Sequence, residues 1–362
     1  MVQINEILNV MVDKKASDLH LKVASFPVFR IDGVLIKQEE LQKLDLTEIE
    51  YVFQQVTTPE QRIIFARELE LDFAYSISGL ARFRVNVMQQ RGTMGFVFRL
   101  VPLKIPSIDE LALPQILKEL VLKPRGLILV TGPTGSGKST TLAAMIDYLN
   151  KNAARSVITI EDPIEFLHHD ENCFIVQRDL GDDTKSFAAA LTHALRHDPN
   201  VIVVGEMRDL DTISTAIMAA ETGHLVLSTL HTTDAAQTVD RIIDVFPQGQ
   251  QQQIRLQLSQ VIEAVVSQAL LPCIGNSGRV GAFEIMIANT AVRNIIRDQR
   301  TFELQNVMQL CSSEGMRTFD EALANLVKAR LVSAENALMK SSNQQQLKGK
   351  LGFEFDAPVR VR

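Results

Sequence analysis

The residues Gly-Pro-Thr-Gly-Ser-Gly-Lys-Ser at positions 132–139 follow an apolar stretch, 126–131, that reads as a β-strand, and they lead into a predicted helix at 138–150. This order of strand, glycine-rich loop and helix is the context that a phosphate-binding loop requires. Glycines let the backbone curl so that its N–H groups point at phosphate oxygens, and the start of the helix adds partial positive charge. The sequence therefore predicts a nucleotide site.

Two side chains of this loop have specific chemical roles in the prediction. Lys138 brings a positive charge to the β- and γ-phosphates, and the hydroxyl of Ser139 is a ligand for Mg²⁺. The alternative, an accidental glycine-rich turn, does not account for the flanking strand and helix. The predicted phosphate-binding residues are Gly132, Pro133, Thr134, Gly135, Ser136, Gly137, Lys138, Ser139 and Thr140.

Strand-like and helix-like segments alternate after the loop. The predicted strands are 156–160, 201–204 and 224–229, and the predicted helices between them are 186–197 and 211–222. Such alternation predicts an α/β fold with a mainly parallel sheet and helices on both faces. The segment 250–271 is predicted to be helical, and the rest of the chain to about residue 339 largely helical apart from a strand at 279–287.

The N-terminal region has a different pattern. An apolar stripe of helical spacing begins at Ile4, and Asp32-Gly33 between two apolar runs is typical of a hairpin. With three further strand-like runs, residues 1–101 are predicted to form a small α+β domain. Two prolines within 102–108 indicate a linker, so we expect a second domain at 109–340. The remaining segment, 341–362, is polar at its start and is expected to be mobile.

Two acidic side chains follow predicted strands of the second domain. Glu165 ends the sequence Ile-Glu-Asp-Pro-Ile-Glu, and Glu206 follows the apolar strand 201–204. The carboxyl ends of parallel strands are where ligands bind in open α/β sheets, so either carboxylate could hold Mg²⁺ through water or orient the attacking water. Asp162 precedes Pro163 and is equally well explained as a turn residue.

Histidines and arginines give weaker signals. His224 and His231 bracket a predicted strand, and their spacing is not that of a metal-binding pair. A strand-end histidine could sense a γ-phosphate, but an ordinary core or turn role is more common. Arg82 and Arg84 alternate with apolar residues, so both project from one strand face, and a further basic residue, Arg99, lies on a later strand. A solvated face explains them, although basic residues can also complete a neighbouring subunit's nucleotide site.

The amino-acid composition excludes several classes of function for this chain. The net charge is −6 and only 6% of residues are aromatic, which argues against nucleic acid as the main partner. The three cysteines are far apart, which favours a reducing compartment. The N-terminus lacks the pattern of a signal peptide, and no apolar run approaches the roughly 20 residues of a membrane span. We therefore predict a cytoplasmic protein with no direct membrane insertion.

Four segments taken together resemble the secretion-type ATPases, which power type II secretion and type IV pili. These are the P-loop at 132–140, the segment 160–165, Gly-Glu-Met-Arg-Asp at 205–209 and Thr-Gly-His-Leu-Val-Leu-Ser-Thr-Leu-His-Thr at 222–232. They are similar to that family's Walker A, Asp, Walker B and His boxes. Ala-Ser-Asp-Leu-His-Leu at 16–21 and Ala-Val-Arg-Asn-Ile-Ile-Arg-Asp at 291–298 resemble the family's pilus retraction branch.

The resemblance implies a PAS-like N-terminal domain, a RecA-like ATPase domain and a hexameric ring that binds ATP and Mg²⁺. By motif, Glu165 matches the proposed general base and Glu206 the Walker B glutamate, which would act on Mg²⁺ through water. His224 and His231 match the His box, whose residues are catalytic in this interpretation.

Arg84 and Arg99 match two arginines that reach the γ-phosphate region. The implied partners are further copies of the chain and an inner-membrane pilus platform protein, at the cytoplasmic face of the membrane.

Three functions remain as alternatives to a retraction motor. Pilus assembly and type II secretion ATPases share the same core, but they usually carry paired CxxC units that this chain lacks. A RecA-like nucleic-acid motor would fit the P-loop but not the acidic balance. A metabolic P-loop kinase would need an acceptor site and lid, and no segment requires one. In the leading interpretation the 291–298 helix presents Arg293 and Arg297 outward, where they would couple nucleotide state to motion.

Overall fold

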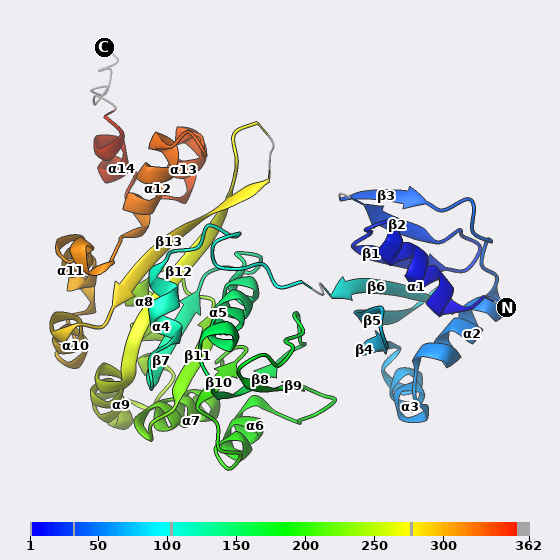
Figure 1. Cartoon of the computed structure of the whole chain (residues 1–362), viewed down its shortest axis with the longest axis horizontal. Helices are drawn as coiled ribbons and strands as arrows, with labels where there is room; N and C mark the ends of the chain where they lie inside the picture. Colours follow the sequence, from blue (N-terminus) through cyan, green and yellow to red (C-terminus); the bar gives the residue numbers. More distant parts are fainter. Residues whose placement is uncertain (1, 32, 102–103, 276–277, 353–362) are drawn as a thin grey trace. The chain divides into compact units, whose positions relative to one another are not determined.

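The computed structural model describes residues 2–31, 33–101, 104–275 and 278–352, which fold into two compact units (Figure 1). The first unit is the chain up to Lys104 together with Glu165–Leu167, and the second is Ile105–Ile164 with the chain from His168 onward. The division falls inside the segment predicted as a linker. Ile108, near the end of that segment, is already buried in the core of the second unit.

In the described part of the first unit, six antiparallel strands form one sheet in the order β3-β2-β1-β6-β5-β4. The strands are β1 (Asp18–Lys22), β2 (Val28–Ile31), β3 (Val34–Lys37), β4 (Glu70–Ile77), β5 (Ala81–Gln90) and β6 (Thr93–Val101). The helices are α1 (Ile4–Asp13), α2 (Leu46–Val56) and α3 (Pro59–Glu68). The predicted stripe of α1 is buried against the sheet, beside a core rich in phenylalanine, so the predicted α+β character is confirmed.

The second unit contains a sheet of seven strands in the described chain, in the order β13-β12-β7-β11-β10-β8-β9. The strands are β7 (Gly126–Thr131), β8 (Ser156–Glu161), β9 (Phe174–Asp179), β10 (Val201–Val204), β11 (Leu225–Leu230), β12 (Ile262–Pro272) and β13 (Arg279–Ile287). Neighbouring strands are parallel except for the antiparallel pair β12–β13. The predicted mainly parallel α/β sheet is confirmed.

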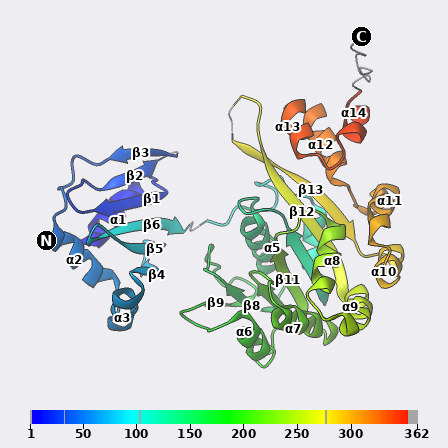
Figure 2. The same cartoon turned by 180° about the vertical axis from the view of Figure 1, so that it is seen from behind.

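Helices cover both faces of this sheet, as Figures 1 and 2 show from opposite sides. One face carries α4 (Ile116–Val121) and α5 (Lys138–Asn152), and the other carries α6 (Phe187–Ala194), α7 (Leu210–Glu221), α8 (Ala235–Asp244), α9 (Gln248–Val261), α10 (Thr290–Arg297) and α11 (Leu304–Leu310). Alternate residues of β7 point into the two cores: Leu127 and Leu129 into one, Ile128 and Val130 into the other. Burial on both faces explains why β7 is a continuous apolar run.

The predicted helix at 250–271 is wrong in its second half. Helix α9 ends at Val261, and the chain continues directly into β12, which pairs in parallel with β7. The second half of the segment is mainly apolar, and a fully buried strand and a buried helix cannot be distinguished by periodicity alone. Pairing with β7, the strand before the P-loop, makes this stretch a strand rather than a helix.

The predicted mobile tail is also wrong over most of its described part. Helices α12 (Phe319–Lys328), α13 (Ala334–Lys340) and α14 (Gln344–Leu351) pack together, and Leu347 is fully buried among them. The buried carboxylate of Asp320 accepts hydrogen bonds from Ser341 Oγ at 2.7 Å and from Asn343 N at 3.2 Å, which fixes the start of α14. The remainder of the predicted tail, residues 353–362, lies outside the described residues.

Candidate nucleotide-binding site

The loop at 132–139 connects β7 to α5, as its sequence predicts. Gly132 has a φ of 143°, and a Cβ at this position would lie 2.2 Å from the carbonyl oxygen of Gln268, so a side chain is excluded. Lys138 is the first residue of α5 and is 9% exposed. Its Nζ donates to the carbonyl oxygens of Gly132 at 2.9 Å and Pro133 at 3.2 Å. The ammonium group is therefore held within the curl of the loop.

The rest of the loop divides into an exposed tip and a buried base. Pro133, Thr134 and Gly135 are exposed, whereas the hydroxyl of Ser136 is buried and has no hydrogen-bond partner among the described residues. Ser139 and Thr140 lie half-exposed on the first turn of α5. An exposed tip and an inward-facing lysine suit a loop that closes around phosphate oxygens.

Gln268 holds the loop from a neighbouring strand, and the sequence did not predict this contact. It lies on β12 and is 4% exposed. Its Nε2 donates to the carbonyl oxygen of Ser136 at 2.7 Å, and its Oε1 accepts from Thr141 Oγ1 at 2.9 Å. One amide thus fixes both the base of the loop and the first turn of α5. A polar residue within an apolar strand was a usable signal, but the segment was predicted as a helix.

Glu206 and His231 come together at the carboxyl ends of β10 and β11. Glu206 follows β10 by two residues, and the Nε2 atom of His231 lies 3.5 Å from its Oε2. The other oxygen, Oε1, accepts from Arg208 Nε at 2.7 Å. Since β11 lies between β10 and β7, this carboxylate and the P-loop are at the same edge of the sheet.

A pocket of about 430 Å³ opens beside this pair. Glu206, Arg208 and His231 line it together with Gln237 and Arg241 of α8. These side chains carry both signs of charge, and apolar residues, among them Met207, Ile213 and Leu230, complete the walls.

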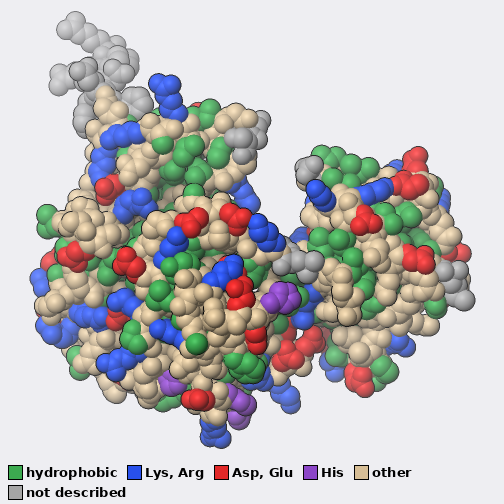
Figure 3. Space-filling model, viewed as in Figure 1, with side chains coloured by type: hydrophobic (Ala, Val, Ile, Leu, Met, Phe, Trp, Pro, Cys, Tyr) green, Lys and Arg blue, Asp and Glu red, His purple; other side chains and the backbone are tan. Residues whose placement is uncertain are grey.

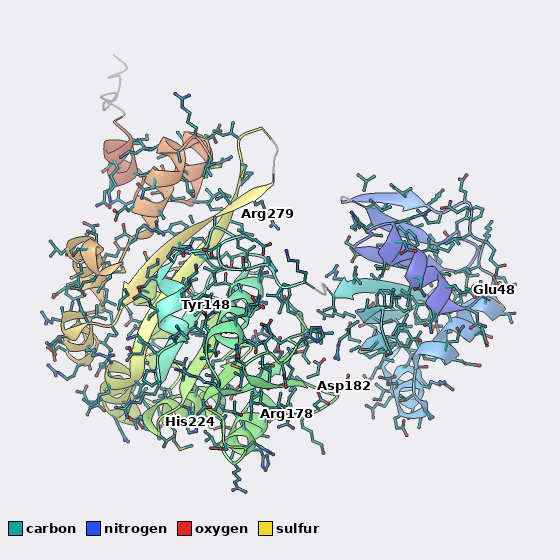
Figure 4. All side chains as sticks on the ribbon, viewed as in Figure 1. Glu48, Tyr148, Arg178, Asp182, His224 and Arg279 are labelled. Atoms are coloured by element: carbon teal, nitrogen blue, oxygen red, sulfur yellow. The ribbon has the colours of Figure 1, made fainter. Side chains whose placement is uncertain are left out.

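His224 does not join this group. It precedes β11, and its backbone oxygen accepts from Gly126 N at the amino end of β7. Its Nδ1 lies 2.9 Å from the carbonyl oxygen of Ala219 at the end of α7. The full length of β11, roughly 17 Å at about 3.3 Å per residue, separates His224 from the edge with the P-loop. Figure 4 labels His224 in the lower part of the second unit.

The segment after β8 carries the other predicted acids. Asp162 and Glu165 are both exposed, and Glu165 belongs to the short stretch grouped with the first unit. The acid that the second unit itself fixes at this strand end is Glu161, whose Oε1 accepts from Thr159 Oγ1 at 2.6 Å and from Gln177 Nε2 at 3.1 Å. Sequence reasoning gave Glu161 no role.

The predicted arginines lie on neighbouring strands of the first unit. Arg84 on β5 faces Arg99 on β6 in the register of the sheet, and both side chains are exposed. Asp18 of β1 faces Arg99 from the other side and accepts a hydrogen bond from its Nε at 2.8 Å. Arg82, also on β5, is half-buried.

Helix α10 corrects the expectation that its charged side chains point outward. Val292, Ile295 and Ile296 are buried, as its amphipathic pattern predicts. Arg293, however, donates from Nη1 to the carbonyl oxygens of Ser259 at 2.9 Å and Gln260 at 2.6 Å. These are among the last carbonyls of α9, which have no partner within their own helix.

The same guanidinium also pairs through Nη2 with Oε1 of Glu263, at 2.7 Å. Arg293 therefore caps α9 from within the second unit. Arg297 is half-exposed and contacts Asp298 beside it, so it fits the expectation.

Comparisons with known proteins find relatives that are similar to this chain over most of its length. The sequence profile described as "Type II/IV secretion system protein" matches residues 1–339. The chain is 46% identical over 340 residues to the type IV pilus retraction ATPase PilT of Pseudomonas aeruginosa, covering 94% of this chain and 98% of that protein. It is 46% identical over 321 residues to a twitching motility protein of Neisseria gonorrhoeae, covering 89% and 86%. A crystal structure of the pilus retraction motor PilT with bound ADP has a TM-score of 0.90 at 44% identity, covering 96% and 100%.

Among the described residues, helices long and apolar enough for a membrane span are absent. Basic and acidic side chains are interspersed over the face of the second unit seen in Figure 3.

Proposed function

The chain belongs to the type II/IV secretion system protein family, and on this premise we propose that it is an ATP-hydrolysing motor that powers retraction of a type IV pilus and hence twitching motility. The observation that carries the proposal is the shared sheet edge at which the P-loop, Glu206 and His231 meet. The match extends over almost the whole chain to proteins named for pilus retraction and twitching motility.

Within this proposal the P-loop binds the phosphates of ATP. The backbone N–H groups of the loop and the ammonium of Lys138 neutralise the β- and γ-phosphates. Ser139 and Glu206 offer oxygen atoms, the ligand type that Mg²⁺ prefers, and groups of three metal-binding side chains are absent from the described chain. That donor set fits an ion held mainly by phosphates and water, which would supply charge neutralisation at the phosphates.

Two carboxylates have the proposed hydrolytic roles. Glu165 acts as general base on the attacking water, and Glu206 orients the water and the Mg²⁺ shell. His231, next to Glu206, reports the state of the γ-phosphate. His224 is not assigned a chemical role within its own chain, because the structure places it at the opposite end of β11.

The proposed assembly is a homo-hexamer in which each first unit serves a neighbour. Arg84 and Arg99 are exposed on one strand pair and supply positive charge to the γ-phosphate region of an adjacent subunit. The motor works at the cytoplasmic face of the inner membrane against a platform protein of the pilus. The separate positions of Cys173, Cys273 and Cys311 favour retraction, because assembly and type II secretion motors usually carry paired CxxC units.

The test is a deletion strain complemented with variants of this chain. We expect deletion to leave piliated, often hyperpiliated, cells that do not twitch, and Lys138→Ala to fail to restore twitching. Lys151→Ala is the matched control, because Lys151 lies at the other end of α5 and its half-exposed side chain pairs with Asp147, one turn away on the same helix. Deletion cells without assembled pili would identify an assembly motor instead. Purified Lys138→Ala protein with normal phosphate release from ATP would refute the P-loop assignment.

A further inference from the structure

Glu284 is a buried carboxylate outside the nucleotide site. It lies on β13 and is 1% exposed. Its Oε1 accepts a hydrogen bond from Ala235 N at 2.8 Å, and its Oε2 accepts one from Phe319 N at 3.2 Å. Ala235 is the first residue of α8 and Phe319 the first residue of α12. The two oxygens of one side chain thus bind the starts of two different helices.

Ordinary helix capping does not require this arrangement. Asp234 already caps α8 by accepting from Gln237 N, and Thr318 caps α12 by accepting from Glu321 N. Glu284 binds the first N–H group of each helix, which these caps leave unpaired. The partial positive charge of both helix ends favours the carboxylate, whereas burial opposes its charge.

The first of these helices is continuous with the nucleotide site. Helix α8 begins four residues after His231, which contacts Glu206. Thr232 Oγ1 and Thr238 Oγ1 are 2.7 Å apart, so the turn after His231 is fixed to the first turns of α8. Gln237 of α8 also lines the pocket beside Glu206. A displacement of His231 therefore displaces the start of α8.

The second helix begins the C-terminal group α12–α14. The segment before it is held on β13, because Ile285 and Arg317 exchange backbone hydrogen bonds at 2.8 and 3.0 Å. Figures 1 and 2 show α12, α13 and α14 gathered at one side of the β12–β13 pair. If either helix start moves away, an oxygen of Glu284 stays buried without its donor, which is unfavourable.

From this geometry we propose that Glu284 is a positioning residue that couples the His231 turn to the C-terminal helices, so that α8 and α12 move together when the nucleotide changes. The inference rests on the proposed ATP response of the second unit. It does not depend on which pilus function the motor serves.

The experiment compares amide hydrogen exchange of the full-length protein with ADP and with the ATP analogue adenylyl imidodiphosphate, at about pH 8, where Glu284 is ionised because this pH lies above its pKa of about 7. In the wild-type protein we expect the two nucleotides to change exchange both at 231–240 and at 319–328. In Glu284→Gln, whose amide can accept only one of the two N–H groups, we expect the difference at 319–328 to be lost while that at 231–240 remains.

A second pair of variants removes one hydrogen bond without touching Glu284. Proline is tolerated at the first position of a helix and lacks an N–H, so Phe319→Pro deletes the donor of α12. Phe319→Ala is its matched control, since it loses the same ring and keeps the N–H. We expect Phe319→Pro to lose the nucleotide-dependent difference at 319–328 and Phe319→Ala to keep it.

A further control is Asp320→Asn, which alters another buried carboxylate of α12 that bonds Ser341 and Asn343 rather than α8. It should raise exchange of the C-terminal helices with either nucleotide and keep their nucleotide dependence. A wild-type protein that responds at 231–240 but not at 319–328 overturns the coupling and leaves the proposed function intact. A protein that responds at neither segment contradicts both. Persistence of the 319–328 response in Phe319→Pro also overturns the coupling.

Discussion

Asp18 and Arg99 face each other across β1 and β6, and the guanidinium Nε donates to the carboxylate at 2.8 Å. Asp18 is buried whereas Arg99 is 66% exposed. Burial opposes ionisation of Asp18, but the hydrogen bonds from Arg99 and Ser17 outweigh it and lower the pKa of this carboxyl. A buried, ionised carboxylate thus orients an exposed arginine, which is the arrangement expected of a side chain presented to another molecule.

Replacing this arginine is expected to remove activity and preserve the fold. Arg99→Ala should lower the ATP turnover of assembled rings by about 100-fold or more, because an arginine at a transferring phosphate contributes about 10³–10⁵ in rate. Asp18→Asn should lower turnover in the same direction by a smaller factor, since Arg99 remains but is no longer oriented. Arg67→Ala, at an exposed pair with Glu68, is the control. Wild-type turnover in Arg99→Ala would contradict the assignment.

Action between subunits is a separate prediction. Rings mixed from Arg99→Ala and Lys138→Ala chains should recover part of the turnover that each variant lacks alone. An intact P-loop can then meet an intact arginine from its neighbour. Steady-state phosphate release at varied mixing ratios measures this. Absence of recovery in rings shown to be mixed would count against a site shared between subunits.

Gln268 is expected to set the affinity of the P-loop. Gln268→Leu keeps the volume and removes the hydrogen bonds to Ser136 and Thr141. Leaving buried partners unsatisfied costs about 1–3 kcal/mol each, so KM for ATP should rise by about tenfold or more. Gln257→Leu, which removes only a surface contact with Glu221, should leave KM unchanged. A Gln268→Leu enzyme with the KM of the wild type would show that the loop holds its shape without this amide.

The two arginines of α10 are expected to differ in how much they contribute to the stability of the fold. Arg293→Ala removes hydrogen bonds to the last carbonyls of α9 and an ion pair with half-buried Glu263, and we expect a loss of about 2–4 kcal/mol in the free energy of unfolding. Arg297→Ala removes an exposed contact with Asp298 and should change stability by less than about 0.5 kcal/mol. Denaturant titration of both variants measures this. Equal stabilities would contradict the capping role of Arg293.

Glu284 is expected to make stability depend on pH. Burial raises its pKa from 4.5 to about 7, so between these values the folded protein holds a proton that the unfolded chain has released. Its contribution to stability is therefore fully present below pH 4.5 and is lost as the pH rises through about 7. The negative charges of Asp234, which caps α8, and Asp320 on α12 also raise the pKa of Glu284, whereas the hydrogen bonds from Ala235 N and Phe319 N lower it.

The measurement is the free energy of unfolding of wild type and Glu284→Gln across this range. Relative to the variant, the wild type should lose on the order of 3 kcal/mol from acid to neutral pH. Parallel pH profiles would show that Glu284 does not titrate in this window.

The P-loop and the parallel sheet could be predicted because their signals are local. The glycines at 132–137 indicate the backbone conformation of the loop itself. The apolar run of β7 indicates that this strand is buried. Strand β12 could not be predicted, because its apolar residues suit a buried helix as well as a strand, and only pairing with β7 decides between them. Gln268 was missed for the same reason.

The positions of individual side chains were harder to predict from the sequence than the backbone structure. His224 and His231 sit at opposite ends of one strand, and their spacing alone does not reveal which end meets the P-loop. Arg293 lies on the predicted polar face of α10, but the length of its side chain lets it reach the end of α9. Leu347 is surrounded by polar residues in the sequence, so no apolar pattern predicts its burial. Its burial depends on the packing of three helices.

The register of the β12–β13 pair has a mechanical consequence. Ser267 faces Glu284 and Gln268 faces Phe283, so the residue that holds the P-loop and the residue that binds the C-terminal helices are adjacent on one antiparallel ribbon. This ribbon is paired from Ala264–Ile287 to Pro272–Arg279, and we expect a ladder of this length to oppose separate movement of its two strands. A loop conformation that keeps the Gln268 hydrogen bonds can change only if the ribbon travels with it. We therefore expect opening of the phosphate loop and displacement of the C-terminal helices to be coupled through this ribbon.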